Sequence, residues 1–164
     1  MNNNILRKNN VIFLSNAIGG IASFQTNLIN FFSKNNINTV LIDNKKETIN
    51  NLKKTRYNKF YKCNVLKDFF KIFRILYKLR EDLKDQNKIF IISNTTIFSI
   101  YFLFLKLFFY NSKIIIFFHS HIYNKNLLQL TSGFICSLFS FFTSKTIYVS
   151  KYTRNWWSLF FPFL

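Results

Sequence analysis

The residues with the clearest chemical potential near the start of the sequence are Ser15 and Asn16, followed closely by Gly19 and Gly20. Glycine lets the backbone turn with a positive φ and lets a phosphate or a sugar approach the backbone amides without a Cβ in the way. The N-terminus of a following helix presents N–H groups and a partial positive charge, which favour an anion. The pattern therefore predicts phosphate binding, although a tight strand-to-helix turn would need the same glycines.

Two established nucleotide-binding fingerprints are absent from this loop. It contains neither the G-x-G-x-x-G of dinucleotide enzymes nor the G-x-x-x-x-G-K-S/T of P-loop proteins, although Asp43 stands near the distance expected for a ribose-binding acid. These observations disfavour a hydride-transferring enzyme and a P-loop ATPase.

Both histidines of the chain, His119 and His121, stand at the end of the strongest apolar run. Histidine titrates near neutral pH, donates hydrogen bonds to phosphates or hydroxyls, and binds metals. On an extended segment the i, i+2 spacing puts both rings on one face, where they would face a cleft as catalytic residues. No carboxylate cluster stands nearby, so no metal site is expected. The alternative is a pair of hydrogen-bonded structural histidines.

Residues 66–85 have the pattern of a basic amphipathic helix. The cations fall in a single stripe at i, i+4, i+7 and i+11, namely Lys67, Lys71, Arg74 and Lys78. A wide apolar face consists of Phe69, Phe70, Ile72, Phe73, Leu76, Tyr77 and Leu79. A basic stripe beside aromatic residues suits the surface of an anionic membrane. An outer helix with a solvated lysine face would show the same pattern.

The elements that must position these residues follow from the order of the apolar runs. Five short runs rich in β-branched or aromatic residues occur at 11–15, 39–43, 89–93, 113–118 and 145–150, with a weaker one at 59–63. Such continuous runs are typical of strands buried on both faces of a parallel sheet. The stretches between them predict crossover helices at 22–35, 66–86, 96–110 and 126–142, and a short helical turn follows residue 150. This alternation predicts an α/β fold, a Rossmann-like doubly wound parallel sheet, in one domain over 1–164.

Each of the five predicted strands ends in small polar or ionisable residues. Besides the residues named above, Asn94 follows the run 89–93, and Ser150 with Lys151 closes the run 145–150. In open α/β sheets the ligand crevice lies outside the carboxyl ends of the strands. The candidate ligand-binding residues are therefore Ser15, Asn16, Gly19, Gly20, Asn94, Ser150 and Lys151. The alternative is that strand ends meet loops and that loops are polar.

The composition of the 164 residues excludes a disordered chain, because 49% are hydrophobic and 20% are aromatic. The formal net charge of +17 implies anionic partners, whether nucleic acid, an anionic membrane or phosphorylated substrates. Codons rich in A and T account for part of the Lys and Phe excess. Cys63 and Cys136 lack the spacing of a metal site or a disulfide framework, which favours a reducing compartment.

Two apolar stretches resemble membrane spans but are too short. The stretch 97–105 is stopped by Lys106, and 133–142 is interrupted by serines. Spanning requires about 20 residues, so buried helices are expected. A small membrane protein that spans through 97–118 and 133–149 is the alternative. With no signal peptide apparent, we expect a cytoplasmic protein, peripheral on the inner membrane face.

In their order and spacing, four segments resemble the N-terminal half of a family 4 glycosyltransferase of the retaining GT-B type. Residues 11–32 resemble the first β-loop-α unit of that family, and 39–43 resemble its second strand. Residues 116–121 resemble its strand that ends in a histidine-containing loop, and 147–155 resemble the segment that closes its first domain. The resemblance covers nearly the whole chain.

The resemblance implies sugar transfer in cell-surface polysaccharide synthesis. The implied partners are a nucleotide-sugar donor and a glycan or lipid-linked acceptor, with no metal or other cofactor. Gly19 and Gly20 would lie against the donor diphosphate, and His119 or His121 would face the cleft near the transferred sugar. The basic stripe would dock this half on an anionic membrane.

The chain departs from that family in the second domain, which holds the nucleotide and carries two glutamates eight residues apart. The only glutamates here are Glu47 and Glu81, and the chain ends near the expected interdomain linker. We therefore expect an enzyme half that is inactive alone, with its C-terminal donor domain absent or separately encoded. The alternative is a non-catalytic basic module for anionic membrane or nucleic acid, although no specific nucleic-acid-binding pattern occurs.

Overall fold

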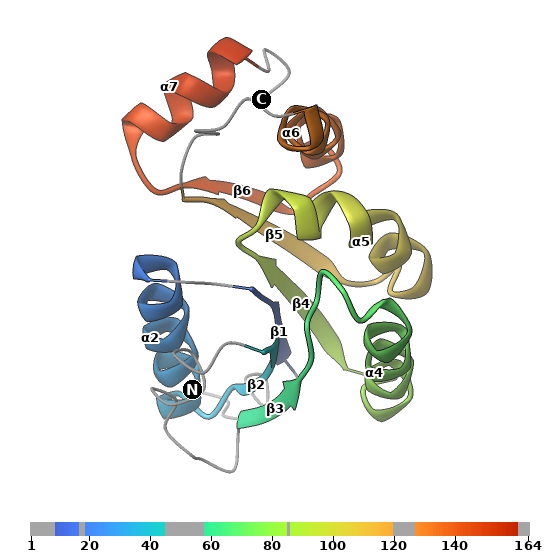
Figure 1. The fold of residues 1–164 in the computed structure, drawn as a ribbon. Coiled ribbons are helices and arrows are strands. Elements are labelled where there is room, and N and C mark those ends of the chain that lie inside the picture. The colour runs from blue at the N-terminus through green and yellow to red at the C-terminus, as the bar shows by residue number, and fades with distance from the viewer. Residues whose placement is uncertain (1–8, 17–18, 45–57, 85, 120–126, 161–164) are drawn as a thin grey trace.

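The computed structural model describes residues 9–16, 19–44, 58–84, 86–119 and 127–160, and Figure 1 shows their arrangement. Strands and helices alternate along these residues. In chain order they are β1 (Asn9–Leu14), α2 (Gly20–Lys34), β2 (Asn38–Asp43), β3 (Asn58–Lys62), α4 (Phe69–Asp82), β4 (Asn87–Ile92), α5 (Thr95–Phe108), β5 (Lys113–Phe118), α6 (Leu127–Ser140), β6 (Lys145–Tyr148) and α7 (Lys151–Phe160).

The strands form one all-parallel sheet in the order β3-β2-β1-β4-β5-β6. Strands β2 and β3 lie on one side of β1. The next strands, β4, β5 and β6, lie in that order on the other side of β1. The strand order therefore reverses between β1 and β4. This topology confirms the predicted α/β fold with a Rossmann-like doubly wound sheet.

The central strands are buried on both faces, which explains their continuous apolar runs. Val11 and Phe13 of β1 face α2 and pack in a cluster with Ile29 of that helix. Ile12 and Leu14 face the other way, into the larger core that includes residues of α4, α5 and α6. Figure 1 shows α2 on one side of the sheet and α4, α5 and α6 on the other. The apolar side chains of these strands thus have an apolar layer to enter on each face.

The C-terminal helix α7 is longer than the short turn that the sequence predicted. It runs for ten residues from Lys151 to Phe160. Trp157, which is almost fully buried, packs against Phe118 of β5 with ring centroids 4.4 Å apart. This contact holds α7 near β6, the last strand of the sheet (Figure 1).

The apolar face predicted for α4 divides into a buried part and an exposed part. Its buried residues are Ile72, Ile75, Leu76 and Leu79. Four aromatic residues of the same helix are exposed, namely Phe69, Phe70, Phe73 and Tyr77. A helix packed on a sheet buries one stripe only, so the remaining aromatic rings lie beside the cations of the outer surface.

None of the helices in the described part of the chain is long and apolar enough to cross a membrane. Helices α5 and α6, which contain the two longest apolar stretches, have 14 residues each.

In the described part of the chain, no group of three or more His, Cys, Asp or Glu side chains is placed to hold a metal ion. Cys63 and Cys136 are buried free thiols, and burial raises the pKa of each.

Candidate functional site

A pocket of about 200 Å³ lies at the carboxyl end of the sheet, where the strand order reverses between β1 and β4. We call it the switch-point pocket. Open α/β sheets bind their ligands in this crevice. The structure brings three of the predicted ligand-binding residues together there, Ser15, Asn16 and Asn94. Among the described residues the lining is Leu14, Ser15, Asn16, Ile21, Gln25, Ser93 and Asn94.

One buried side-chain amide hydrogen-bonds to two walls of the switch-point pocket. Gln25 of α2 is fully buried, and its Oε1 accepts a hydrogen bond from Ser15 Oγ at 2.6 Å. Its Nε2 donates to Ser93 Oγ. Because Ser15 follows β1 and Ser93 follows β4, this amide fixes both strand ends against the helix. The pocket is therefore pre-formed by the fold.

The two glycines at the start of α2 have different roles. Gly19 has φ 60° and ψ −132°, a conformation that only glycine adopts readily. It occupies the N-cap position without a side-chain cap, and its carbonyl accepts the Ser23 N–H at 3.1 Å. A Cβ built on Gly20 would meet no atom of the described residues within 4 Å. The backbone turn requires Gly19, whereas Gly20 has open space around it and precedes Ile21, which lines the switch-point pocket. Neither predicted glycine is itself among the described lining residues.

The N-terminus of α2 is the feature of this corner that favours an anion, whereas the other polar atoms described here are acceptor oxygens. The first turn of α2 contains no acidic residue, so nothing there neutralises the positive end of the helix dipole. Asn16 Oδ1 is buried and has no hydrogen-bond partner in the described part of the chain. Asn94 caps α5 by accepting the Ile97 N–H at 3.1 Å. Asp43, at the end of β2, is fully buried and accepts the Asn44 N–H at 2.6 Å.

The histidine that the structure describes lies outside the switch-point pocket. His119 follows β5 and contacts the rings of Phe24, at 5.2 Å, and Phe117, at 5.9 Å. Burial lowers its pKa, so the ring is neutral at pH 7. Its Nε2 is buried without a hydrogen-bond partner among the described residues. His121 lies outside the described residues.

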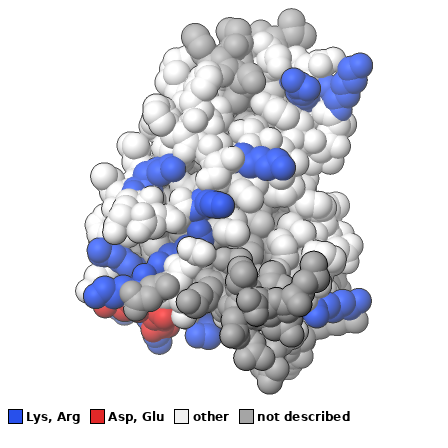
Figure 2. Space-filling view, turned by 180° about the vertical axis from the view of Figure 1, so that it is seen from behind, with Lys and Arg blue, Asp and Glu red and all other residues white. Residues whose placement is uncertain are grey.

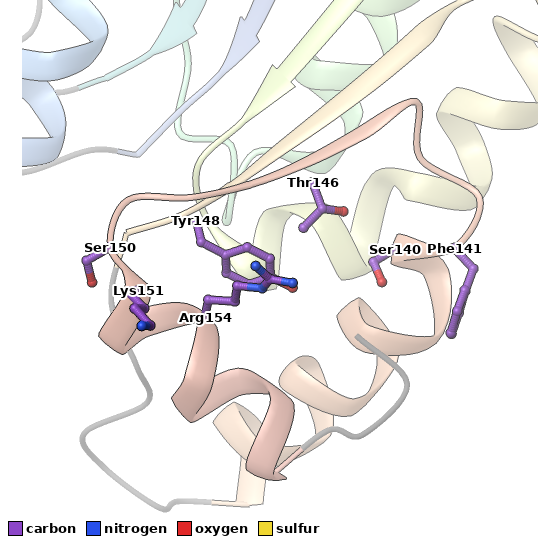
Figure 3. Close-up of a pocket in the computed structure, with 7 residues that line it drawn as sticks. All are labelled: Ser140, Phe141, Thr146, Tyr148, Ser150, Lys151 and Arg154. Atoms are coloured by element: carbon purple, nitrogen blue, oxygen red, sulfur yellow. The ribbon is translucent and has the colours of Figure 1, made fainter.

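Ser150 and Lys151 belong to a different pocket, which Figure 3 shows in close-up. Because β4 and β5 separate β6 from β1, these two residues are not part of the switch-point pocket. Their own pocket has a volume of about 650 Å³ and lies between β6, α7 and the end of α6. We call it the β6–α7 pocket. Its lining is Ser140, Phe141, Thr146, Tyr148, Ser150, Lys151 and Arg154.

Three of the four predicted membrane-facing cations lie on α4. Lys67 precedes α4, and all four side chains, of Lys67, Lys71, Arg74 and Lys78, are exposed. Figure 2 shows one face of the molecule, on which cations are scattered widely and the visible acidic side chains gather at one lower corner. The charge excess is thus spread over this face and is not confined to α4.

Sequence reasoning missed several side chains that shape the two pockets. Gln25 and Ser93 in the first, and Tyr148 and Arg154 in the second, were not predicted as site residues. A glutamine on the buried face of a helix was the available signal for Gln25. The i, i+3 spacing of Lys151 and Arg154 was the signal for Arg154, because such residues share a helix face.

Comparisons with known proteins give fold information only. No protein family profile matches the chain, and no curated protein sequence is similar to it. The C-terminally truncated TubZ of Clostridium botulinum phage c-st is similar in structure, with a TM-score of 0.56, 12% sequence identity and 82% of this chain covered. A second TubZ structure from the same phage gives a TM-score of 0.49, 12% identity and 81% coverage. The chain spans about half of these structures, 48% and 46% of their lengths.

These comparisons overturn the function that the sequence resemblance implied. The prediction of sugar transfer in polysaccharide synthesis is wrong, because no family profile and no curated protein supports it and the similar structure is a TubZ. The physical reason is that alternating strands and helices in this order are common to many proteins with unrelated activities. The order and spacing of the segments identified the fold and not the chemistry.

Proposed function

We propose that the chain binds a nucleotide through its phosphates at the switch-point pocket. The observation that carries the proposal is the convergence, at the β1/β4 reversal, of a glycine turn, the N-terminus of α2 without a side-chain cap, and a pocket lined by polar side chains. The strand order is the one in which nucleotides bind across this crevice. At about 200 Å³ the pocket holds the phosphate end of the ligand, with the remainder lying in the open crevice.

The chemistry of the lining supports binding without a chemical step. The described residues around the pocket are apolar, hydroxyl or amide side chains, with no carboxylate, imidazole or ammonium group among them. The hydroxyls of Ser15 and Ser93 and the amides of Asn16 and Asn94 offer neutral hydrogen bonds. The positive charge for the phosphate comes from the N-terminus of α2.

The test is a titration of the 15N-labelled chain with AMP and with inorganic pyrophosphate, in which the Kd at this pocket is read from the amide shifts of its lining residues Ser15 and Asn16. We expect Gly20→Val to raise the Kd of both probes about tenfold or more, since one lost charge-assisted contact has about that effect. The new side chain would enter open space, so Tm should stay within about 3 °C of the wild-type value.

Asn27→Val is the matched control, because Asn27 is exposed two turns further along α2. It should leave both Kd values unchanged. Equal binding by the wild type and Gly20→Val, or the absence of any binding by the wild type, contradicts the proposal.

A second candidate function, peripheral binding to an anionic membrane, rests on one specific observation. Phe70 of α4 is 94% exposed and stands among exposed cations, with Lys71 next to it and Arg74 one turn on. An exposed aromatic ring enters the interface of a bilayer, while neighbouring cations attract anionic headgroups. The hollow between α4 and β3, about 630 Å³, is lined by Phe70, Lys71 and Arg74 as well.

Sedimentation with vesicles tests this association. We expect the chain to bind phosphatidylglycerol vesicles more strongly than phosphatidylcholine vesicles. Phe70→Ser should weaken binding to phosphatidylglycerol vesicles about tenfold, because one aromatic ring no longer enters the bilayer interface. Phe31→Ser is the control, because Phe31 is 58% exposed on α2, across the sheet from α4. A similar loss of binding in both variants, or equal binding to both lipids, would contradict membrane binding through α4.

A further inference from the structure

The β6–α7 pocket combines cations with hydroxyl groups in one concave surface. Figure 3 shows Arg154 and Lys151 of α7 on one side, Tyr148 and Thr146 of β6 on another, and Ser140 with Phe141 at the end of α6. At about 650 Å³ its volume is typical of pockets that hold small molecules. Its position at β6 makes it distinct from the switch-point pocket, so the inference below does not depend on the proposed function.

The cations of this pocket have no acidic neighbour along their part of the chain. The sequence contains no Asp or Glu after Asp85, so β5, α6, β6 and α7 hold no acidic side chain. The acidic side chains that the structure describes lie in β2 and in or just before α4: Asp43, Asp68, Glu81 and Asp82. Two positive charges without a local counter-charge favour an external anion.

The fold holds these groups in fixed positions. Ser150 caps α7, because its Oγ accepts the Thr153 N–H at 3.0 Å, and Lys151 and Arg154 then fall on one side of the helix. Trp157 anchors the same helix on Phe118. Tyr148 stacks on Phe118 with ring centroids 5.2 Å apart and planes 12° apart. The backbone positions that carry the two cations, and the ring of Tyr148, are therefore set by the fold.

The donor set of the pocket suits a phosphate group. Arg154 offers a planar fork of N–H donors and Lys151 a compact ammonium group. Burial raises the pKa of the Tyr148 hydroxyl, although Arg154 acts in the opposite direction, so the hydroxyl is a protonated donor at neutral pH. Phe141, which is 64% exposed, offers an apolar wall for the rest of the ligand.

We propose that the β6–α7 pocket binds the phosphate group of a small phosphorylated molecule, with Arg154 and Lys151 contacting the phosphate and Phe141 contacting the organic part.

The experiment is a titration of the 15N-labelled chain with sodium phosphate, glycerol phosphate and AMP, followed by nuclear magnetic resonance at constant ionic strength. We expect saturable shifts of the backbone amides of Ser150, Lys151 and Arg154 with all three probes. Sodium acetate should cause no such shifts. A comparison of glycerol phosphate with AMP tells whether a ring in the ligand adds affinity.

Arg154→Gln should raise the Kd for each phosphate probe about tenfold, the usual effect of losing a charge-assisted hydrogen bond. Lys145→Gln is the matched control, since Lys145 is exposed at the start of β6 but is not among the residues that line the pocket. It should change the Kd less than twofold. Both side chains are exposed, so neither change should affect folding.

A second pair of variants tests the apolar wall. Phe141→Ala should weaken AMP binding about threefold and leave inorganic phosphate unaffected, since the apolar contact involves only the organic part. Phe142→Ala, at an adjacent and equally exposed position that does not line the pocket, should change neither.

Three results would overturn the proposal: no shifts at Ser150, Lys151 and Arg154, equal shifts with acetate, or equal losses in Arg154→Gln and Lys145→Gln. Shifts at Gly19 and Gly20 report on the switch-point pocket in the same spectra. The failure of one site is therefore distinguishable from the failure of the other.

Discussion

Trp157→Ala is expected to lower the free energy of unfolding by about 3–5 kcal/mol, the usual cost of removing a buried tryptophan side chain. Trp157 is 1% exposed and is the largest of the fully buried side chains. Its ring lies 4.4 Å from Phe118 and 5.5 Å from Trp156, between centroids. The loss would leave a cavity between α7 and the sheet, and it is a large part of the roughly 5–15 kcal/mol that stabilises a typical domain.

Urea unfolding followed by circular dichroism measures this loss. Tyr152→Ala in the same helix is the control, because Tyr152 is 65% exposed, and it should cost less than about 1 kcal/mol. A loss of less than about 1 kcal/mol in Trp157→Ala would mean that α7 is not anchored through this ring. The same variant should also abolish phosphate-induced shifts in the β6–α7 pocket, whose cations α7 carries.

Gln25→Ala is expected to lower the free energy of unfolding by about 2–4 kcal/mol, from the lost buried hydrogen bonds and the cavity left behind. The Gln25 amide bonds Ser15 Oγ and Ser93 Oγ inside the protein, where water cannot easily replace it. The ends of β1 and β4 would also lose their common partner. We therefore expect AMP binding at the switch-point pocket to weaken at least tenfold.

Two comparisons make this prediction specific. Asn27→Ala removes an exposed amide from the same helix and should change the stability by less than about 0.5 kcal/mol. The titration with AMP should be done well below the unfolding temperature of the variant, so that the measured affinity belongs to folded protein. Unchanged affinity in folded Gln25→Ala would show that the amide supports the fold and not the pocket.

The strands were predictable because their side chains enter apolar layers on both faces. The run 113–118 was predicted with the bounds that β5 has, and the central strands differ by only a few residues. Strand β3 gave a weaker signal because it is an edge strand in which Lys59, Phe60 and Lys62 are exposed. Helix α7 was underestimated as a short turn, although its apolar and polar residues recur with a helical period and Trp157 lies on the buried side.

The candidate site was predictable only in part. Polar strand ends at Ser15, Asn16 and Asn94 followed from the general rule for parallel sheets, and the switch-point pocket unites them. The same rule grouped Ser150 with them, although β4 and β5 lie between β6 and β1. Strand order depends on which crossover each helix makes, and no local pattern in this sequence encodes it.

The sequence by itself determined the alternation of strands and helices, a glycine-containing turn after the first strand, and the charge that attracts anions. These properties follow from hydrophobic periodicity, backbone conformation and ionisation, which act locally along the chain. The tertiary structure alone decided that Gln25 joins the ends of β1 and β4, that Arg154 lines a pocket with Tyr148, and that Phe70 faces outward. These arrangements require residues distant in sequence to meet, and burial in three dimensions selects which of the possible contacts form.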